Sequence, residues 1–162
     1  MKMAEMADVV TFRTNVVRPV LQRLNLWSEV AENLMVGTAL QESLLKYTRQ
    51  IGGPALGYFQ MEPATHKDCW VNFLKYRSTL AEKVRSFVPE SLVEIPDPEI
   101  MVDNPYYACA MARVKYFRSS KPLPKDPTDI VSLGNYWKEI YNTMLGKGKP
   151  EEFISKYEKY AK

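Results

Sequence analysis

The chain has few of the residues from which metal centres and nucleophilic active sites are usually built. Its 162 residues include two cysteines, Cys69 and Cys109, and a single histidine, His66. The cysteines lack CxxC or Cys/His spacing, so we expect no metal site and interpret both as free, buried thiols. Because His66 has no serine or cysteine partner at motif spacing, a histidine-based nucleophilic mechanism is disfavoured.

Long apolar runs, a signal peptide and a strong charge of one sign are also missing. No window approaches about 18 uninterrupted apolar residues, so we expect no membrane-spanning segment. Glu5 and Asp8 lie where a signal peptide has its apolar run, which predicts synthesis in a cytoplasm without export. The net charge of +3, from 22 Lys and Arg against 19 Asp and Glu, comes without a dense basic stripe and disfavours nucleic-acid binding.

A helical period of apolar residues runs through almost the whole sequence. The first predicted helix spans 7–24, with Pro19 either kinking it or starting a second piece. A second helix is predicted over 28–46, with Ser28 as its N-cap.

Later helices are predicted from their start signals. Asn104-Pro105 and Asp126-Pro127 each combine an N-cap residue with a proline at the first helical position. Together with the periodicity, such signals predict helices over 63–76, 78–87, 105–117, 127–145 and 150–162.

Two segments do not follow the helical period. The glycine-rich residues 52–57 predict a loop, followed by a short strand over 58–61. Residues 88–105 contain four prolines and predict a surface excursion without a helix. Because there is no internal repeat, low-complexity tract or linker, the sequence predicts a mainly α fold, a single compact helical domain over residues 1–162.

Glu42 is the candidate catalytic residue. Met35, Thr38 and Ala39 precede it at helical spacing, which places the carboxylate on a face of small and apolar side chains. Near the C-terminal end of a helix, both partial burial and the helix dipole raise the pKa of a carboxyl, as a general acid requires at neutral pH. The simpler alternative is a glutamate at the rim of the helix whose carboxylate reaches water.

A specific pattern follows this glutamate. Glu42-Ser43 precedes Gly-Tyr-Phe-Gln at 57–60 and Pro-Ala-Thr at 63–65, with eighteen residues from the glutamate to the glutamine. Residues 42–65 thereby resemble the lytic transglycosylases of the lysozyme-like superfamily, in which Glu-Ser ends a helix, Gly-x-x-Gly-hydrophobic-hydrophobic-Gln follows, and Pro-x-Thr starts the next helix. Gly53 lies one residue further upstream than this pattern asks.

The resemblance implies a lysozyme-like α+β fold with minimal β structure, a catalytic cleft, and peptidoglycan cleavage without a cofactor or metal. In such an enzyme Glu42 protonates the β-1,4 oxygen between N-acetylmuramic acid and N-acetylglucosamine. It then acts as a base on the muramic 6-hydroxyl, which closes a 1,6-anhydro ring. The residues implied in substrate binding are Ser43, Gly57, Tyr58, Phe59, Gln60, Tyr141 and Asn142.

The roles implied for these residues differ. Gln60 and the loop backbone would orient the sugar, and Ser43 would help fix Glu42. Tyr141 would hold either Glu42 or the acetamido group of the sugar. It is matched, with Asn142, to a family helix that carries Ala-Tyr-Asn-Ala-Gly, although both flanking small residues differ. Tyr136 is a competing candidate for the cleft tyrosine.

Three features resemble the family variant carried by phage virions: the lack of a signal peptide, the compact size, and Gly-Pro-Ala-Leu-Gly at 53–57 before the aromatic pair. This implies peptidoglycan glycan strands and other virion proteins as partners, a place in the virion, and action in the bacterial periplasm or cell wall. A hydrolytic muramidase or endolysin is one alternative. An inactive structural virion protein with the same fold is another.

Bulky and basic residues outside the motif have simpler interpretations. Trp27, Trp70 and Trp137 lie at helical positions and are interpreted as core rather than as a carbohydrate platform. The tail lysines at helical spacing, Lys156, Lys159 and Lys162, are interpreted most simply as a solvated helix face, with contact to an anionic wall polymer or a partner protein as the alternative.

Overall fold

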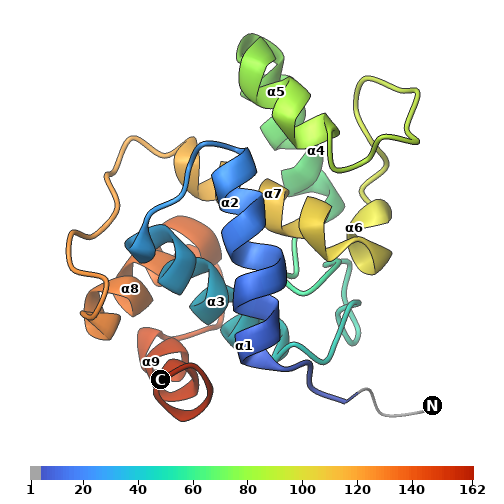
Figure 1. Ribbon diagram of the computed structural model, residues 1–162. Coiled ribbons are helices and arrows are strands. Elements are labelled where there is room, and N and C mark those ends of the chain that lie inside the picture. The colour runs from blue at the N-terminus through green and yellow to red at the C-terminus, as the bar shows by residue number, and fades with distance from the viewer. Residues whose placement is uncertain (1–4) are drawn as a thin grey trace.

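Helices form nearly all of the regular structure of residues 5–162, the part of the chain that this computed structural model describes (Figure 1). In chain order the elements are α1 (Val9–Phe12), the π-helix η1 (Arg13–Val17), α2 (Arg18–Arg23), α3 (Glu29–Ser43), α4 (Pro63–Asn72), the 3₁₀ turn η2 (Leu74–Tyr76), α5 (Ser78–Arg85), α6 (Ile100–Asp103), α7 (Pro105–Phe117), α8 (Ile130–Tyr136), the π-helix η3 (Trp137–Asn142) and α9 (Pro150–Tyr160). The expectation of a mainly α, single compact domain is confirmed. None of these helices is both long enough and apolar enough to cross a lipid bilayer.

α1, η1 and α2 follow one another along a single rod, drawn in blue in Figure 1. Asp8 caps α1, because its Oδ2 accepts a 2.8 Å hydrogen bond from the backbone N–H of Thr11. The π-helical turns end at Val17, so Pro19 falls in the first turn of α2, directly after them. α2 is thus assigned from Arg18, next to Pro19, but its backbone continues from η1 without a break.

α3 is the central element of the core, with residues 30–40 all buried. It begins as predicted, since Ser28 Oγ accepts a 3.0 Å hydrogen bond from the backbone N–H of Ala31. It ends at residue 43, three residues before the predicted end, because Leu44 and Leu45 both take a left-handed conformation with φ of 53°. This early end leaves Glu42 in the last turn of α3.

The last helix, α9, packs against α3 and α8 and closes the C-terminal side of the core (Figure 1). The ring of Phe153 lies directly on Gly37 of α3, where a Cβ atom would fall 2.2 Å from the ring. The same ring stacks on Trp137 with 5.9 Å between ring centroids. Because only a glycine permits this approach, Gly37 allows α9 and η3 to lie next to the end of α3.

The predicted strand over 58–61 is wrong. Residues 57–60 form a tight turn in which Gly57 (φ 77°) and Gln60 (φ 48°) have a left-handed backbone. Positive φ at both ends of the turn is incompatible with an extended strand. The turn is closed by an isolated antiparallel bridge between Leu56 and Met61.

The prediction that residues 88–105 contain no helix is also wrong. They include α6, a single helical turn that lies after Pro98 and before Pro105. The prolines flank this turn rather than interrupt it, so they do not prevent it. The helices predicted to begin at residues 63, 78, 105 and 150 do begin there.

The helix predicted over 127–145 begins at Ile130 as α8 and continues from Trp137 as the π-helix η3. Asp126 accepts instead from the backbone N–H of Thr128, at 2.8 Å, and caps a turn. The N-cap of α8 is Asp129, whose Oδ1 accepts a 3.1 Å hydrogen bond from the backbone N–H of Ser132. The second half of the predicted helix is the π-helix η3, which supplies two of the predicted site residues.

Candidate active site

The end of α3, the turn at 57–60, the start of α4, the end of α7 and the π-helix η3 enclose a cleft of about 850 Å³. Four of the predicted site residues line it: Glu42, Gln60, Tyr141 and Asn142. They come from three segments that are far apart in the sequence, and the fold brings their side chains into one cleft. This cleft is the candidate active site.

The carboxyl group of Glu42 is partly buried in the cleft, and it has one hydrogen-bond partner among residues 5–162. Trp137 donates a 3.0 Å hydrogen bond from its indole Nε1 to Oε2 of Glu42. Burial raises the pKa of Glu42 to about 7, against the hydrogen bond from Trp137 and the positive charges of Lys115 and Lys156, which lower it. The group therefore changes its charge near neutral pH, which suits an acid and base.

Lys115 of α7 lines the cleft and interacts electrostatically with the glutamate. Its Nζ donates a 2.6 Å hydrogen bond to the backbone oxygen of Tyr141 and lies 4.1 Å from the centre of that tyrosine ring. Burial lowers the pKa of Lys115, while the negative charge of Glu42 raises it. The cleft thus contains a cation that responds to the protonation state of the candidate catalytic group.

Tyr141 lines the cleft, but its hydroxyl group is already engaged. Tyr141 donates a 2.6 Å hydrogen bond from its hydroxyl to the backbone oxygen of Phe59. The competing candidate, Tyr136, does not line the cleft; it donates to the backbone oxygen of Lys121 at 2.9 Å and stacks on Tyr116. Of the two tyrosines, Tyr141 is therefore the one in the cleft, where it joins η3 to the turn at 57–60.

The side-chain amide of Gln60 bonds to the backbone of its own turn. Its Nε2 donates a 2.8 Å hydrogen bond to the backbone oxygen of Gly57, which closes the turn. Gly57 is required at this position because its φ is 77° and an added Cβ would lie 2.7 Å from the backbone oxygen of Met101. The side chain of Gln60 is half-buried on the cleft wall, in a place from which it can contact a ligand.

Ser43, Tyr58 and Phe59 hold the turn against the core and do not line the cleft. Ser43 Oγ donates a 2.7 Å hydrogen bond to the backbone oxygen of Tyr58 rather than to Glu42. The ring of Phe59 is 1% exposed, and both aromatic rings pack on Phe12, with centroids 5.8 and 6.0 Å away. The substrate contacts expected for these three residues are therefore replaced by a structural role.

Sequence reasoning missed Trp137, Lys115 and Lys156. Trp137 is fully buried, as a core residue would be, but it precedes Tyr141 by four residues and so shares its helix face. Lys115 directly follows a run of buried residues, 107–114. A charged residue next to such a run can indicate a functional site, because charged side chains are rarely buried without a partner. The half-buried Lys156, interpreted as solvated, donates a 2.9 Å hydrogen bond to the side chain of Gln41 at the cleft wall.

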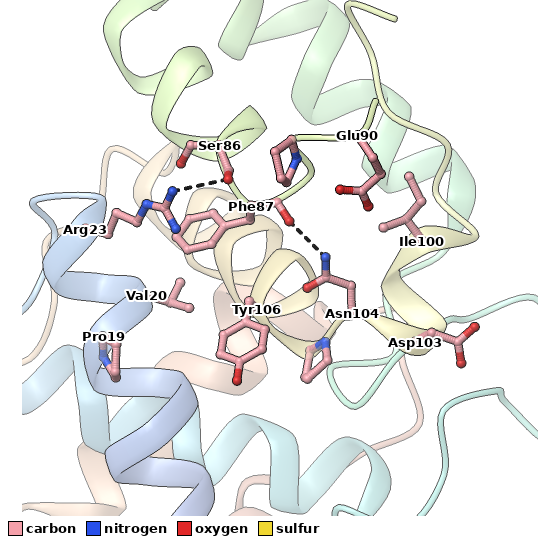
Figure 2. Close-up of a pocket in the computed structure, with 12 residues that line it drawn as sticks. Pro19, Val20, Arg23, Ser86, Phe87, Glu90, Ile100, Asp103, Asn104 and Tyr106 are labelled. Carbon is pink, nitrogen blue, oxygen red and sulfur yellow. Dashed lines mark hydrogen bonds between the residues drawn. The ribbon is translucent and has the colours of Figure 1, made fainter. Parts of the chain in front are cut away.

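A second pocket, of about 840 Å³, lies apart from the cleft between α2, α6 and the start of α7 (Figure 2). Arg23 stacks on the ring of Phe87 and donates a 3.2 Å hydrogen bond to the backbone oxygen of Ser86. Asn104 donates a 2.9 Å hydrogen bond to the backbone oxygen of Phe87. These contacts hold the segment after α5 in place, and none of the predicted site residues lines this pocket.

Of the other residues singled out in the sequence, His66, Cys69, Cys109 and Trp70 lie in the core, whereas Trp27 does not. Trp27 is 46% exposed in the segment before α3, and its indole Nε1 donates a 2.9 Å hydrogen bond to Glu32, so its interpretation as a core residue is wrong. His66 Nε2 is 2.6 Å from the hydroxyl of Tyr107, and burial lowers the pKa of His66 to about 4. Cys69 and Cys109 are free and buried, as predicted. Within residues 5–162, no three His, Cys, Asp or Glu side chains come together in a way that could hold a metal ion.

Comparisons of the chain with family models, curated proteins and solved structures find no match.

Proposed function

We propose that this chain is a peptidoglycan lytic transglycosylase with a lysozyme-like fold, and that Glu42 is its single acid and base. The observation that carries the proposal is the Glu42 carboxyl group, which lies in a cleft of about 850 Å³ and whose pKa burial raises to about 7. A group that first donates and then accepts a proton works best with a pKa near the working pH. The phage-particle setting stays a prediction of the sequence resemblance.

In the proposed reaction, protonated Glu42 donates its proton to the glycosidic oxygen as the bond to the muramic C1 breaks. The resulting carboxylate then accepts the proton of the muramic 6-hydroxyl, whose oxygen attacks C1 and closes the anhydro ring. The hydrogen bond from Trp137 to Oε2 fixes the orientation of the carboxyl group and leaves Oε1 for the proton transfers. Because the nucleophile belongs to the substrate, no activated water is needed.

The carboxylates in the cleft favour this one-acid chemistry over ordinary glycoside hydrolysis. Hydrolases of the usual kind use two carboxyl groups, separated by about 5–5.5 Å for retention or about 6.5–9.5 Å for inversion. Besides Glu42, the cleft is lined by one other carboxylate, Glu62, which is exposed. Glu62 accepts no hydrogen bond from another side chain within residues 5–162 that would hold it as a base or nucleophile.

Digestion of purified peptidoglycan, followed by mass spectrometry of the products, tests the proposal. We expect 1,6-anhydro-muropeptides from the unmodified chain and none from Glu42→Gln, whose fold is checked by circular dichroism. Glu29→Gln, an exposed change in the first turn of the same helix, is the matched control and should retain activity.

Each other outcome has a definite meaning. Products that all carry reducing ends, with activity lost in Glu62→Gln as well, would establish a two-carboxylate muramidase instead. If the unmodified chain releases no product from peptidoglycan, the proposed enzyme activity is rejected in favour of a structural role.

A further inference from the structure

A side groove lies beside the cleft at the end of α7. It has a volume of about 400 Å³, roughly half that of the cleft, and is lined by Asn72, Phe73, Lys115, Arg118, Ile140 and Thr143, among others. Lys115, Arg118 and Thr143 line both hollows. The cleft and the side groove are therefore neighbouring hollows, and they share two cationic side chains in their walls.

The two cations at this junction have spare hydrogen-bonding capacity. Lys115 bonds to the backbone oxygen of Tyr141 and takes part in none of the ion pairs among residues 5–162. Arg118 pairs through Nη1 with Asp68 at 2.6 Å, with the aspartate side chain 44% exposed. A guanidinium group has five N–H donors, so this single contact leaves most of them free for a planar anion.

Acidic groups offset part of the positive charge at the junction, since Asp68 pairs with Arg118, and both Glu42 and Glu62 raise the pKa of Lys115 against the burial that lowers it. Glu139, on the wall of the side groove, is paired with Lys121, and Glu62 is exposed on the cleft wall. Glu42 is protonated in part of the molecules near neutral pH, because burial raises its pKa to about 7. Lys147 adds a further positive charge on the cleft wall.

We propose that Lys115 and Arg118 form a carboxylate-binding subsite, and that the side groove receives the acidic peptide that branches from the muramic sugar. The two residues are three apart at the end of α7, so their side chains lie on one helix face. A glycan strand that occupies the cleft carries its peptide branches sideways, and the side groove lies directly beside the cleft. This inference rests on the proposed function, since it names the part of that substrate which the junction recognises.

Binding is tested in the Glu42→Gln background, so that recognition is separated from cleavage. The probes are soluble glycan strands with their peptides and the same strands stripped of peptides by an amidase, titrated calorimetrically. We expect the strands with peptides to bind about tenfold more tightly, because a charge-assisted bidentate contact contributes on that scale. Arg118→Gln should abolish this difference, and Arg118→Lys, which keeps the charge but loses the planar fork, should retain part of it.

Lys125→Gln is the matched control, because it removes one exposed positive charge that lines neither hollow and should change nothing. The subsite is rejected if both kinds of strand bind equally, or if Lys125→Gln weakens binding as much as Arg118→Gln does. If neither kind of strand binds to the Glu42→Gln protein, the proposed function fails together with the subsite.

Discussion

The indole Nε1 of Trp137 donates a 3.0 Å hydrogen bond to Oε2 of Glu42, and so joins the first residue of η3 to the last turn of α3. The tryptophan is fully buried, whereas the glutamate is partly open to the cleft. Oε2 of Glu42 is thereby held by an indole group that is packed in the core and shielded from solvent. The bond also favours the ionised form of Glu42, against the burial that disfavours it.

Replacing Trp137 with phenylalanine should therefore move the pH profile of the enzyme. Without the indole N–H the ionised form loses a stabilising hydrogen bond, so the pKa of Glu42 rises further above about 7. A hydrogen bond to a charged group is worth enough to move the alkaline limb of kcat/KM upward by about one pH unit. Rates of wall digestion between pH 5 and pH 9 check this, because the pH dependence of kcat/KM reports the pKa of the essential acid. An alkaline limb that stays in place would show that another group limits activity.

Glu42→Gln should make the protein more stable in alkaline solution. Burial raises the pKa of Glu42 from 4.5 to about 7, so the fold favours the protonated form. The free energy of unfolding gains this contribution fully below pH 4.5 and loses it as the pH rises through about 7. Glutamine at position 42 does not titrate. At pH 8 the free energy of unfolding of the variant should therefore exceed that of the unmodified chain by about 3 kcal/mol. Urea unfolding at pH 4 and pH 8 measures the difference, which should nearly vanish at pH 4.

Signals that act over a few residues predicted much of the fold. Ser28 and Asn104 are N-caps in the structure because their side chains bond to backbone N–H groups three residues later. The same reasoning failed at Asp126, where a bond to Thr128, two residues later, forms a turn instead. Local chemistry permits both outcomes, and tertiary packing selects one.

The candidate site was predictable only in part, for a related reason. The spacing from Glu42 to Gln60 is visible in the sequence, and both residues do line one cleft. The contact between Trp137 and Glu42 spans 95 residues, so no local pattern indicates it. Nor does any local preference indicate the successive left-handed residues Leu44 and Leu45, which end α3 just after the glutamate.

Gly57→Ala should destabilise the turn that carries Gln60 far more than Gly52→Ala does. Both glycines have a left-handed backbone, with φ of 77° and 73°, so each alanine meets a similar conformational cost of about 1 kcal/mol. At Gly57 the added Cβ would also lie 2.7 Å from the backbone oxygen of Met101, whereas at Gly52 no heavy atom lies within 4 Å. Thermal unfolding of the two variants should therefore differ by at least about 2 kcal/mol. Equal losses would mean that the contact with Met101 is relieved without cost.

The buried Glu32 joins the N-terminal rod to α3. Its carboxylate accepts hydrogen bonds from Arg18 at 2.7 Å, from Trp27 at 2.9 Å and from Arg13 at 3.0 Å. Burial opposes ionisation of Glu32, but these partners outweigh it and lower the pKa to about 2. The stabilisation is therefore complete above pH 4.5 and is lost as the pH falls toward about 2.

Glu32→Gln should thus destabilise the protein by about 3 kcal/mol at pH 7, because it leaves two arginines without their shared anion. Near pH 2 to 3 the glutamate of the unmodified chain is itself becoming protonated, so the gap between the two proteins should narrow. Glu29→Gln, on the exposed side of the same first turn, is the matched control and should shift stability by less than about 0.5 kcal/mol. Denaturant unfolding at pH 7 and pH 3 makes the comparison. A gap of the same size at both pH values would assign the loss at pH 7 to altered packing around residue 32 rather than to its charge.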